Sequence, residues 1–213
     1  MTFSRIKNPI NFSYSIDDVP LKSSGDSIHD LGFTLTRTLC PVKHIEEICC
    51  KAQKILGFVF RITQEFRLSS PLKALYCALV RPVLEYGCVL WDPSTSSASA
   101  MIERVQRKFL HYSAFKLDIP HPPHDYTPVL HSLNLSSLAD RRHSLNLSFL
   151  YGLLSDNIDS PEILSLINFK VPARNTRSQF PFHIPFSSSN YYLNSPIVRL
   201  MILTNTDTSF IIQ

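Results

Sequence analysis

Apolar residues recur at three- and four-residue spacing from Ile45 to Phe66, and this stripe constrains the fold more than any other feature of the chain. Its members are Ile45, Ile48, Cys49, Ala52, Ile55, Leu56, Val59, Ile62 and Phe66. A period of this kind gives a long helix one apolar face, which must be buried against other elements. Pro41 suits the first helical turn, and Glu46 and Glu47 lie near the positive end of the helix dipole. The sequence therefore predicts a helical core that begins near Pro41.

Two further helices are expected to pack against this stripe. Ser70 and Pro71 indicate a helix start, because serine is a good N-cap and proline is tolerated in the first turn. Pro82 is expected to break or kink this helix, since proline removes a backbone donor and crowds the preceding turn. The inward residues of this helix would be Leu72, Leu75, Tyr76, Leu79 and Val80. The next helix is predicted over about residues 98 to 115, with an apolar side formed by Ile102, Val105 and Phe109.

The N-terminal residues alternate as a strand does. The apolar side of a first, half-buried strand would consist of Ile10, Phe12, Tyr14 and Ile16. Asp17 and Asp18 are expected to turn the chain into a return strand that starts at Val19–Leu21. A third short strand is expected within Ser27–Leu35, with Gly32 as a bend or a point of close approach. Three short strands form too small a sheet to be stable on their own.

Beyond residue 116 the character of the chain changes. The connector IPHPPHDYTP is too rich in proline to be regular helix. Helical patterns follow it at Val129–Leu133, at Ser136–Leu154 and from Ser160-Pro161 to Ile167. After Val171 the chain is rich in Pro, Ser and Asn, and we expect an irregular tail.

These patterns predict a mainly α fold with a small N-terminal β-hairpin, an α+β arrangement. We divide the chain into a β segment (1–38), a helical bundle (39–116), a C-terminal helical region (117–170) and the tail (171–213).

Composition narrows the class of protein further. The 213 residues are 44% hydrophobic and 18% charged, as in a globular protein that can bury a core. No signal peptide is visible, and the longest apolar run, near Leu145–Leu154, is shorter than the about 20 residues a spanning helix needs. The five cysteines contain no C-x-x-C pair, and their odd number argues against a disulfide framework. We therefore expect no membrane partner and an intracellular location, in the nucleus or cytoplasm.

Few residues are arranged as catalytic groups or metal ligands. Asp17 and Asp18 are adjacent carboxylates, and polymerases hold two divalent cations with such residues on a hairpin. The turn interpretation is favoured, because a cation site would also need a carboxylate on a separate upstream strand. A second group has no familiar metal-site spacing and consists of His121, His124, Asp125 and His131. Without a phosphate loop or nucleophile elbow, we predict no catalytic residue and no retained cofactor.

Basic residues follow one side of the helix predicted near residues 98 to 115. Intervals of three and four residues separate Arg104, Arg107, Lys108 and His111, on the side opposite Ile102 and Val105. A second basic group is expected on the outer side of the first helix and consists of Lys51, Lys54 and Arg61. Positive side chains along a solvated stripe can follow a phosphate backbone. The alternative is an ordinary solvated helix face, partly neutralised by Glu103.

Several strings of residues resemble successive parts of one protein family. INFSYSIDDVPL and SIHDLGFTL are similar to the end of the palm and the primer-grip hairpin of reverse transcriptases from jockey-like non-LTR retrotransposons. HIEEICCKAQKILGFVFRITQEF, LKALYCALVRPVLEYGCVLWDP and IERVQRKFLHYS resemble the helical thumb of these enzymes and its C-terminal extension. The segment that begins DYTPVLHSLNLSSLADRR resembles the region that follows, so the resemblance runs from Met1 to about Arg199.

The chain departs from the family pattern in two places. Family members usually have Asp-Gly where this chain has Asp17-Asp18, and the final MILTNTDTSFIIQ does not fit the pattern.

The resemblance implies a truncated RNA-directed DNA polymerase. In the family, the Tyr-x-Asp-Asp box and the other catalytic Asp lie upstream of the strand that begins this chain. The fragment would therefore be inactive alone and would not retain the Mg²⁺ of the parent enzyme. Matching positions assign the primer grip to Phe12, Tyr14, Val19 and Leu21, and place Arg104, Arg107 and Lys108 near an RNA–DNA template–primer. The alternative is a nucleic-acid-binding or helical interaction remnant with no enzymatic activity.

The resemblance also has a consequence for the N-terminal hairpin. In the family this hairpin packs on a palm sheet that the chain lacks, so its apolar face is expected to be exposed.

Overall fold

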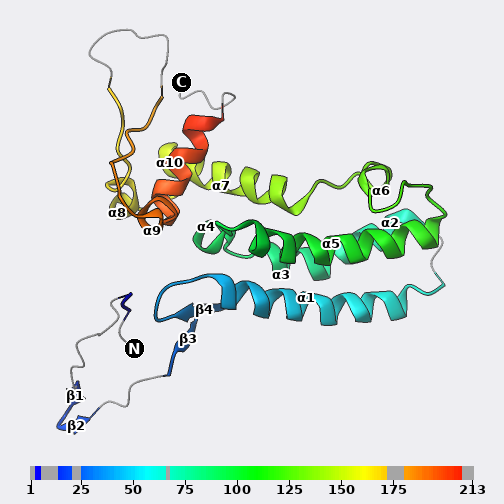
Figure 1. Ribbon diagram of the computed structural model, residues 1–213, viewed down its shortest axis with the longest axis horizontal. Coiled ribbons are helices and arrows are strands. Elements are labelled where there is room, and N and C mark those ends of the chain that lie inside the picture. Colours follow the sequence, from blue (N-terminus) through cyan, green and yellow to red (C-terminus); the bar gives the residue numbers. More distant parts are fainter. Residues whose placement is uncertain (1–2, 6–13, 21–24, 66–67, 172–179, 208–213) are drawn as a thin grey trace.

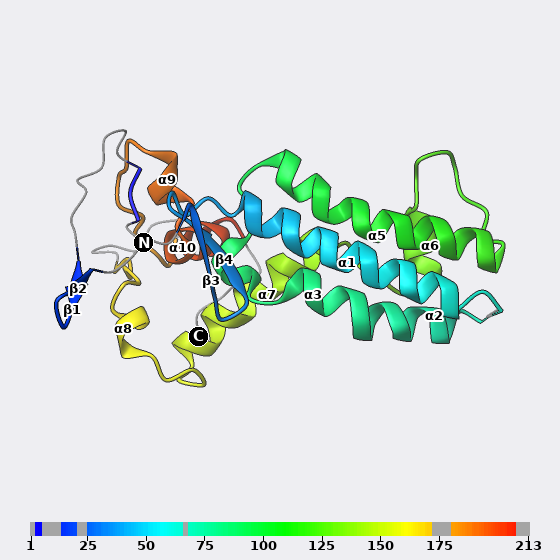
Figure 2. The same ribbon diagram turned by 90° about the horizontal axis from the view of Figure 1, so that it is seen from below.

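The computed structural model describes residues 3–5, 14–20, 25–65, 68–171 and 180–207. It is mainly helical with small N-terminal β-hairpins, which confirms the predicted fold class (Figure 1). An elongated helical bundle is formed by α1 (Val42–Ile62), α2 (Ser69–Leu75), η1 (Tyr76–Val80), α3 (Arg81–Glu85) and α5 (Ser96–Leu117). Figure 2 shows α1 and α5 side by side along the length of this bundle.

The remaining helices connect to this bundle or gather at one end of it. They are α4 (Cys88–Trp91), α6 (Thr127–Ser132), α7 (Leu138–Leu154), α8 (Pro161–Leu164), α9 (Asn190–Leu193) and α10 (Pro196–Thr206). In Figure 1, α6 lies at the end of the bundle opposite to α8, α9 and α10.

The bundle core is built from the predicted apolar stripes. The inward residues of α1 are Ile45, Cys49, Ala52, Leu56 and Val59, and those of α5 include Ile102, Val105 and Phe109. At the centre, the buried rings of Tyr76 and Phe109 stack with their centroids 4.2 Å apart. Leu79 and Ile62, both predicted to face inward, are exposed, and Phe66 of the predicted stripe lies outside the described residues.

The first helical residues differ slightly from the prediction. Pro41 is the N-cap of α1 rather than part of its first turn, and α2 begins at Ser69, so Ser70 lies inside the helix.

Pro82 was expected to break or kink its helix; it does not break the helical path, but the regular α-helix is disturbed just before it. The α2 helix passes into the π-helical turn η1, which leads directly into α3 with Pro82 in its first turn. A π-turn changes the hydrogen-bond register, and proline fits the first turn of a helix because its missing donor is not needed there. The path ends instead at Gly87, whose φ of 58° is left-handed.

The N-terminal hairpin turns where the sequence predicts. β1 (Ser15–Ile16) pairs antiparallel with β2 (Val19–Pro20), and Asp17 and Asp18 both have positive φ, at 49° and 60°. Two successive residues of this kind form the tight turn whose twist suits a hairpin, and aspartate tolerates that conformation. The side chains of Tyr14, Ile16 and Val19 are exposed, so the strand is not half-buried.

The predicted third strand is wrong, because this segment is a second hairpin. β3 (Ser27–Asp30) pairs antiparallel with β4 (Phe33–Thr36) in a sheet of its own. Leu31 and Gly32 form the turn, with φ of 46° and 85°. Gly32 is both the predicted bend and a point of close approach: its positive φ lets the chain reverse, and a Cβ there would lie 3.3 Å from Tyr86 Cε1.

The second hairpin is anchored through Phe33. Its ring stacks on Tyr86 at 5.3 Å and lies 5.5 Å from the ring of His44. His44 Nδ1 accepts a hydrogen bond from the Thr34 backbone N–H at 3.3 Å, and burial lowers the pKa of this histidine. The chain passes close to the Phe33 ring at Gly87, where a Cβ atom would lie 2.3 Å from Phe33 Cζ.

Trp91, the one tryptophan of the chain, lies at the same junction. Its indole Nε1 donates a hydrogen bond to the Tyr86 carbonyl oxygen at 2.8 Å, and its ring meets that of His44 edge-on at 5.6 Å. Trp91 is buried.

The tail predicted to be irregular contains α9 and α10. Val198, Leu200 and Met201 of α10 are buried in a second apolar cluster with Leu150 and Leu153 of α7. Ser195 and Pro196 begin α10 with the same serine–proline start that begins α8, so the signal was present in the sequence. We did not recognise this helix start, because the Pro-, Ser- and Asn-rich composition of the tail suggested irregular structure.

A buried polar network joins the bundle to these C-terminal helices. Asp92 accepts hydrogen bonds from Arg142 Nε at 3.0 Å and from Asn146 Nδ2 at 2.9 Å. Arg199 of α10 donates to the backbone oxygens of Val89 at 2.6 Å and of Asp92 at 3.3 Å. Arg142 is 2% exposed, so its charge depends on these partners.

Candidate nucleic-acid interface

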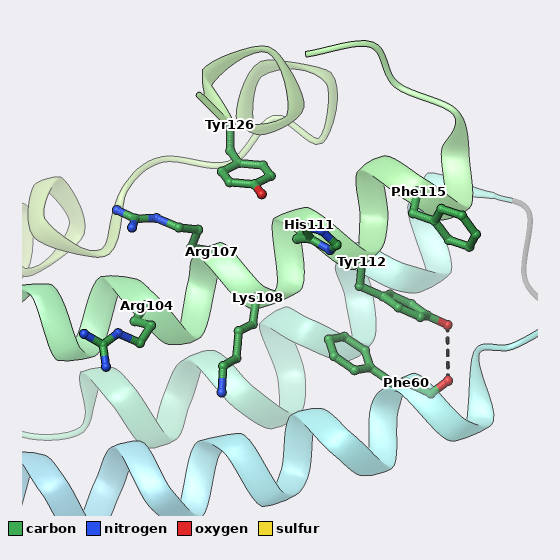
Figure 3. Close-up of a pocket in the computed structure, with 8 residues that line it drawn as sticks. All are labelled: Phe60, Arg104, Arg107, Lys108, His111, Tyr112, Phe115 and Tyr126. Atoms are coloured by element: carbon green, nitrogen blue, oxygen red, sulfur yellow. Dashed lines mark hydrogen bonds between the residues drawn. The ribbon is translucent and has the colours of Figure 1, made fainter. Parts of the chain in front are cut away.

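The basic residues predicted on α5 line one groove. Arg104, Arg107, Lys108 and His111 are exposed on the side opposite the buried Ile102 and Val105. The groove is open to solvent and has a volume of about 490 Å³ (Figure 3).

One aromatic pair forms a fixed part of the groove wall. The rings of Phe60 on α1 and Tyr112 on α5 stack with centroids 4.1 Å apart. Tyr112 Oη donates a hydrogen bond to the Phe60 carbonyl oxygen at 3.2 Å and lies 3.1 Å from Thr63 Oγ1. This pair packs α1 against α5, so its first role is structural.

Two other aromatic residues complete the groove wall. Phe115 is 80% exposed at the end of α5, and Tyr126 extends over α5 from the segment before α6 (Figure 3). The ring of Tyr126 lies 4.7 Å from that of His121 and 6.2 Å from that of His111. Together with the fixed pair, these rings give the groove an aromatic wall beside its basic residues.

Asp125 holds the start of α6 in place. Its carboxylate accepts hydrogen bonds from the backbone N–H of Thr127 at 2.9 Å and from the Thr127 hydroxyl at 2.6 Å. These bonds lower the pKa of Asp125 and fix the backbone next to Tyr126.

The charges of the groove are not neutralised. No acidic residue is among the described residues that line it. Within the described part of the chain, Arg104 and Arg107 make no hydrogen bond or ion pair, and Lys108 Nζ donates to Gln53 Oε1 at 3.1 Å. The basic side chains therefore remain available to an anion.

Glu103 does not neutralise these cations, as the alternative of an ordinary solvated helix face would require. Its carboxylate lies 3.8 Å from Arg142 Nη1, at the interface of α5 with α7, and burial raises its pKa. The neighbours Glu103 and Arg104 are about 100° apart around a helix, which places their side chains on different faces.

The other predicted site residues are not brought to this groove. Lys51, Lys54 and Arg61 are exposed on α1, but none of them lines it. Of the primer-grip residues, Tyr14 and Val19 are exposed on the first hairpin, which lies at the end of the molecule far from α6 (Figures 1 and 2). Phe12 and Leu21 lie outside the described residues.

Other candidate sites do not form a metal centre in the described structure. No group of three or more His, Cys, Asp or Glu side chains that could hold a metal ion occurs among the described residues. All five cysteines are free thiols, and burial raises the pKa of Cys49 and Cys88 to about 11. In the described part of the chain, no helix is long and apolar enough to cross a membrane.

The aromatic half of the groove was missed from the sequence. Phe115 follows His111 by four residues and so continues the basic stripe, a signal that the helical period offers. Tyr126 gave no such signal, because its position depends on how the proline-rich connector folds back over α5.

Comparisons of the chain with models of protein families, with curated proteins and with solved structures found no match.

Proposed function

We propose that the chain binds the phosphate backbone of nucleic acid along the α5 groove. In this proposal it is the thumb-like part of a jockey-like retrotransposon reverse transcriptase, with no polymerase activity of its own. The observation that carries the proposal is the exposed, unneutralised basic stripe of α5, in which Arg104 and Arg107 have no partner among the described residues. The family part of the proposal rests on the resemblance of the sequence strings given above.

The chemistry of the groove suits a polyanion better than a small anion. Its cations are spread along the helix rather than converging on one point, and from Arg104 to His111 the helix rises about 10 Å. Contacts of this kind release counterions from nucleic acid, so the affinity should depend strongly on salt. The net charge of +4 is compatible with such a partner but does not by itself indicate one.

Replacing Arg104, Arg107 and Lys108 together by alanine is expected to weaken binding to an RNA–DNA hybrid by about tenfold or more at low salt. Each lost phosphate contact should also lower the slope of log affinity against log salt by about one. Fluorescence anisotropy of a labelled hybrid, titrated over a range of salt concentrations, measures both quantities.

The matched control is the triple variant Lys51→Ala, Lys54→Ala and Arg61→Ala. It removes the same positive charge from exposed positions of α1 that do not line the groove. Equal losses for the two triple variants would mean that net charge, not the groove, governs binding. Absence of binding by the wild-type chain would instead favour a helical interaction role.

We expect no template-dependent primer extension by the purified chain with Mg²⁺ present. The reason is the absence of the family's catalytic carboxylate boxes from the sequence. The measurement compares extension of a labelled primer on an RNA template with a no-enzyme control, and any extension above that control would overturn the inactive assignment.

A further inference from the structure

Two further rings line the groove beside its basic side chains. Phe115 is 80% exposed, whereas Tyr126 is partly buried against the bundle core and lies beside the rings of His111 and His121. A single exposed ring is ordinary on a protein surface. These two lie in one groove together with four basic side chains, and that combination is chemically specific.

We infer that the α5 groove binds single-stranded nucleic acid and stacks unpaired bases on Phe115 and Tyr126. The inference rests on the backbone binding proposed above and names the substrate class. Aromatic side chains beside a basic track are the chemistry that proteins use for single strands without sequence preference.

The geometry of α5 allows both kinds of contact to one strand. Arg104, Lys108, His111 and Phe115 follow one another at intervals of four, three and four residues, so they form one line along the helix. This line is about 16 Å long. A strand that follows it would meet cations at the Arg104 end and an exposed ring at the Phe115 end (Figure 3).

Base stacking allows the groove to distinguish single strands from duplexes. In a duplex each base face is covered by its neighbours, so a side chain at the helix surface meets only phosphates, sugars and base edges. An unpaired base can place its free face against a phenyl or phenol ring. The cations alone would bind either form, whereas the aromatic rings add affinity only for unpaired bases.

The groove also has few of the groups that read base sequence. No Asn, Gln, Asp or Glu side chain is among the described residues that line it, so adenine and cytosine edges have no matching side chain there. Stacking on an aromatic ring is open to every base, because each base has a flat face. We therefore expect little dependence on base sequence, and RNA and DNA strands are to be tested side by side.

The experiment measures binding of the full chain to four labelled oligonucleotides of equal length by fluorescence anisotropy. These are a mixed-sequence RNA strand, the DNA strand of the same sequence, the matched RNA–DNA hybrid, and an abasic DNA strand that keeps the phosphates. We expect the base-containing strands to bind more tightly than the hybrid and the abasic strand.

Phe115→Leu should weaken binding to the RNA and DNA strands by about fivefold or more, while binding to the hybrid and the abasic strand stays unchanged. Because Phe115 is exposed, this variant should fold normally. Phe186→Leu is the matched control, since Phe186 is 96% exposed and lies outside the groove, and it should change nothing.

The outcomes distinguish this inference from the proposed function. If the abasic strand binds as tightly as the base-containing strands, or if Phe115→Leu has no effect, the stacking inference is wrong while backbone binding stands. If the wild-type chain binds none of the four oligonucleotides, the proposed function fails as well. A difference between the RNA and DNA strands would identify which of them the groove prefers.

Discussion

Replacing Asp92 by alanine is expected to destabilise the protein by about 3–5 kcal/mol. Asp92 accepts hydrogen bonds from Arg142 and Asn146, and Arg199 Nε lies 4.0 Å from its carboxylate. Arg142 is almost fully buried, and burial already lowers the pKa of Arg199. Without the carboxylate, both guanidinium groups would remain in an enclosed site with their main countercharge removed.

Urea denaturation followed by circular dichroism measures this loss of unfolding free energy. Glu85→Ala is the control, because Glu85 also pairs with two arginines, Arg81 and Arg141, but these stay partly solvated. Because the arginines that pair with Glu85 keep access to water, removing this carboxylate should cost less than removing Asp92 from beside the buried Arg142. Similar losses for the two variants would show that burial of the arginine partners does not set the cost of losing a carboxylate.

Gly87→Ala is expected to destabilise the protein by about 2–4 kcal/mol. The left-handed φ of 58° at this position costs an alanine about 1–2 kcal/mol. The new Cβ would also lie 2.3 Å from Phe33 Cζ, so the ring and the hairpin that carries it must move. Differential scanning calorimetry or urea denaturation measures the change.

A double-mutant cycle separates the two causes. In a Phe33→Ala background the clash is absent, and Gly87→Ala should then cost only the backbone strain. Gly57→Ala is the control for added bulk, because nothing lies within 4 Å of its Cβ position and alanine favours a helix interior. It should leave stability unchanged or raise it slightly. Additive losses in the cycle would contradict a contact between Phe33 and Gly87.

The parts of the fold that the sequence predicted are those in which local periodicity determines the answer. The stripes of α1 and α5 bury the residues that the helical period selects, such as Leu56 and Phe109. The turn at Asp17-Asp18 was also predictable, because aspartate tolerates the conformation that a tight hairpin needs.

The errors arose where tertiary packing decides between local alternatives. Pro82 was expected to break or kink its helix, and the structure shows the milder outcome, a π-turn before Pro82 that keeps the helical path continuous. The α10 helix begins in a segment whose composition suggests a loop, and it is stabilised by packing against α7. A hydrophobic partner far away in the chain cannot be read from a local window.

In the candidate site too, features set by local periodicity were predictable and features set by tertiary packing were not. The basic stripe of α5 followed from helical spacing, since Arg104 and Lys108 are one turn apart. The side on which Glu103 lies could not be predicted in this way, because its partner Arg142 comes from a different helix. Tyr126 reaches the groove through the fold of the proline-rich connector, where Asp125 bonds Thr127 at the start of α6.

The position of Trp91 gives the protein a built-in optical reporter. As the one indole of the chain, it accounts for the tryptophan fluorescence of the entire molecule. It is buried where the second hairpin, α1 and α4 meet, and Asp92 follows it directly. Its emission therefore reports the wetting of this one junction, while circular dichroism reports the helices as a whole. A transition seen first by fluorescence would mean that the junction opens before the bundle unfolds.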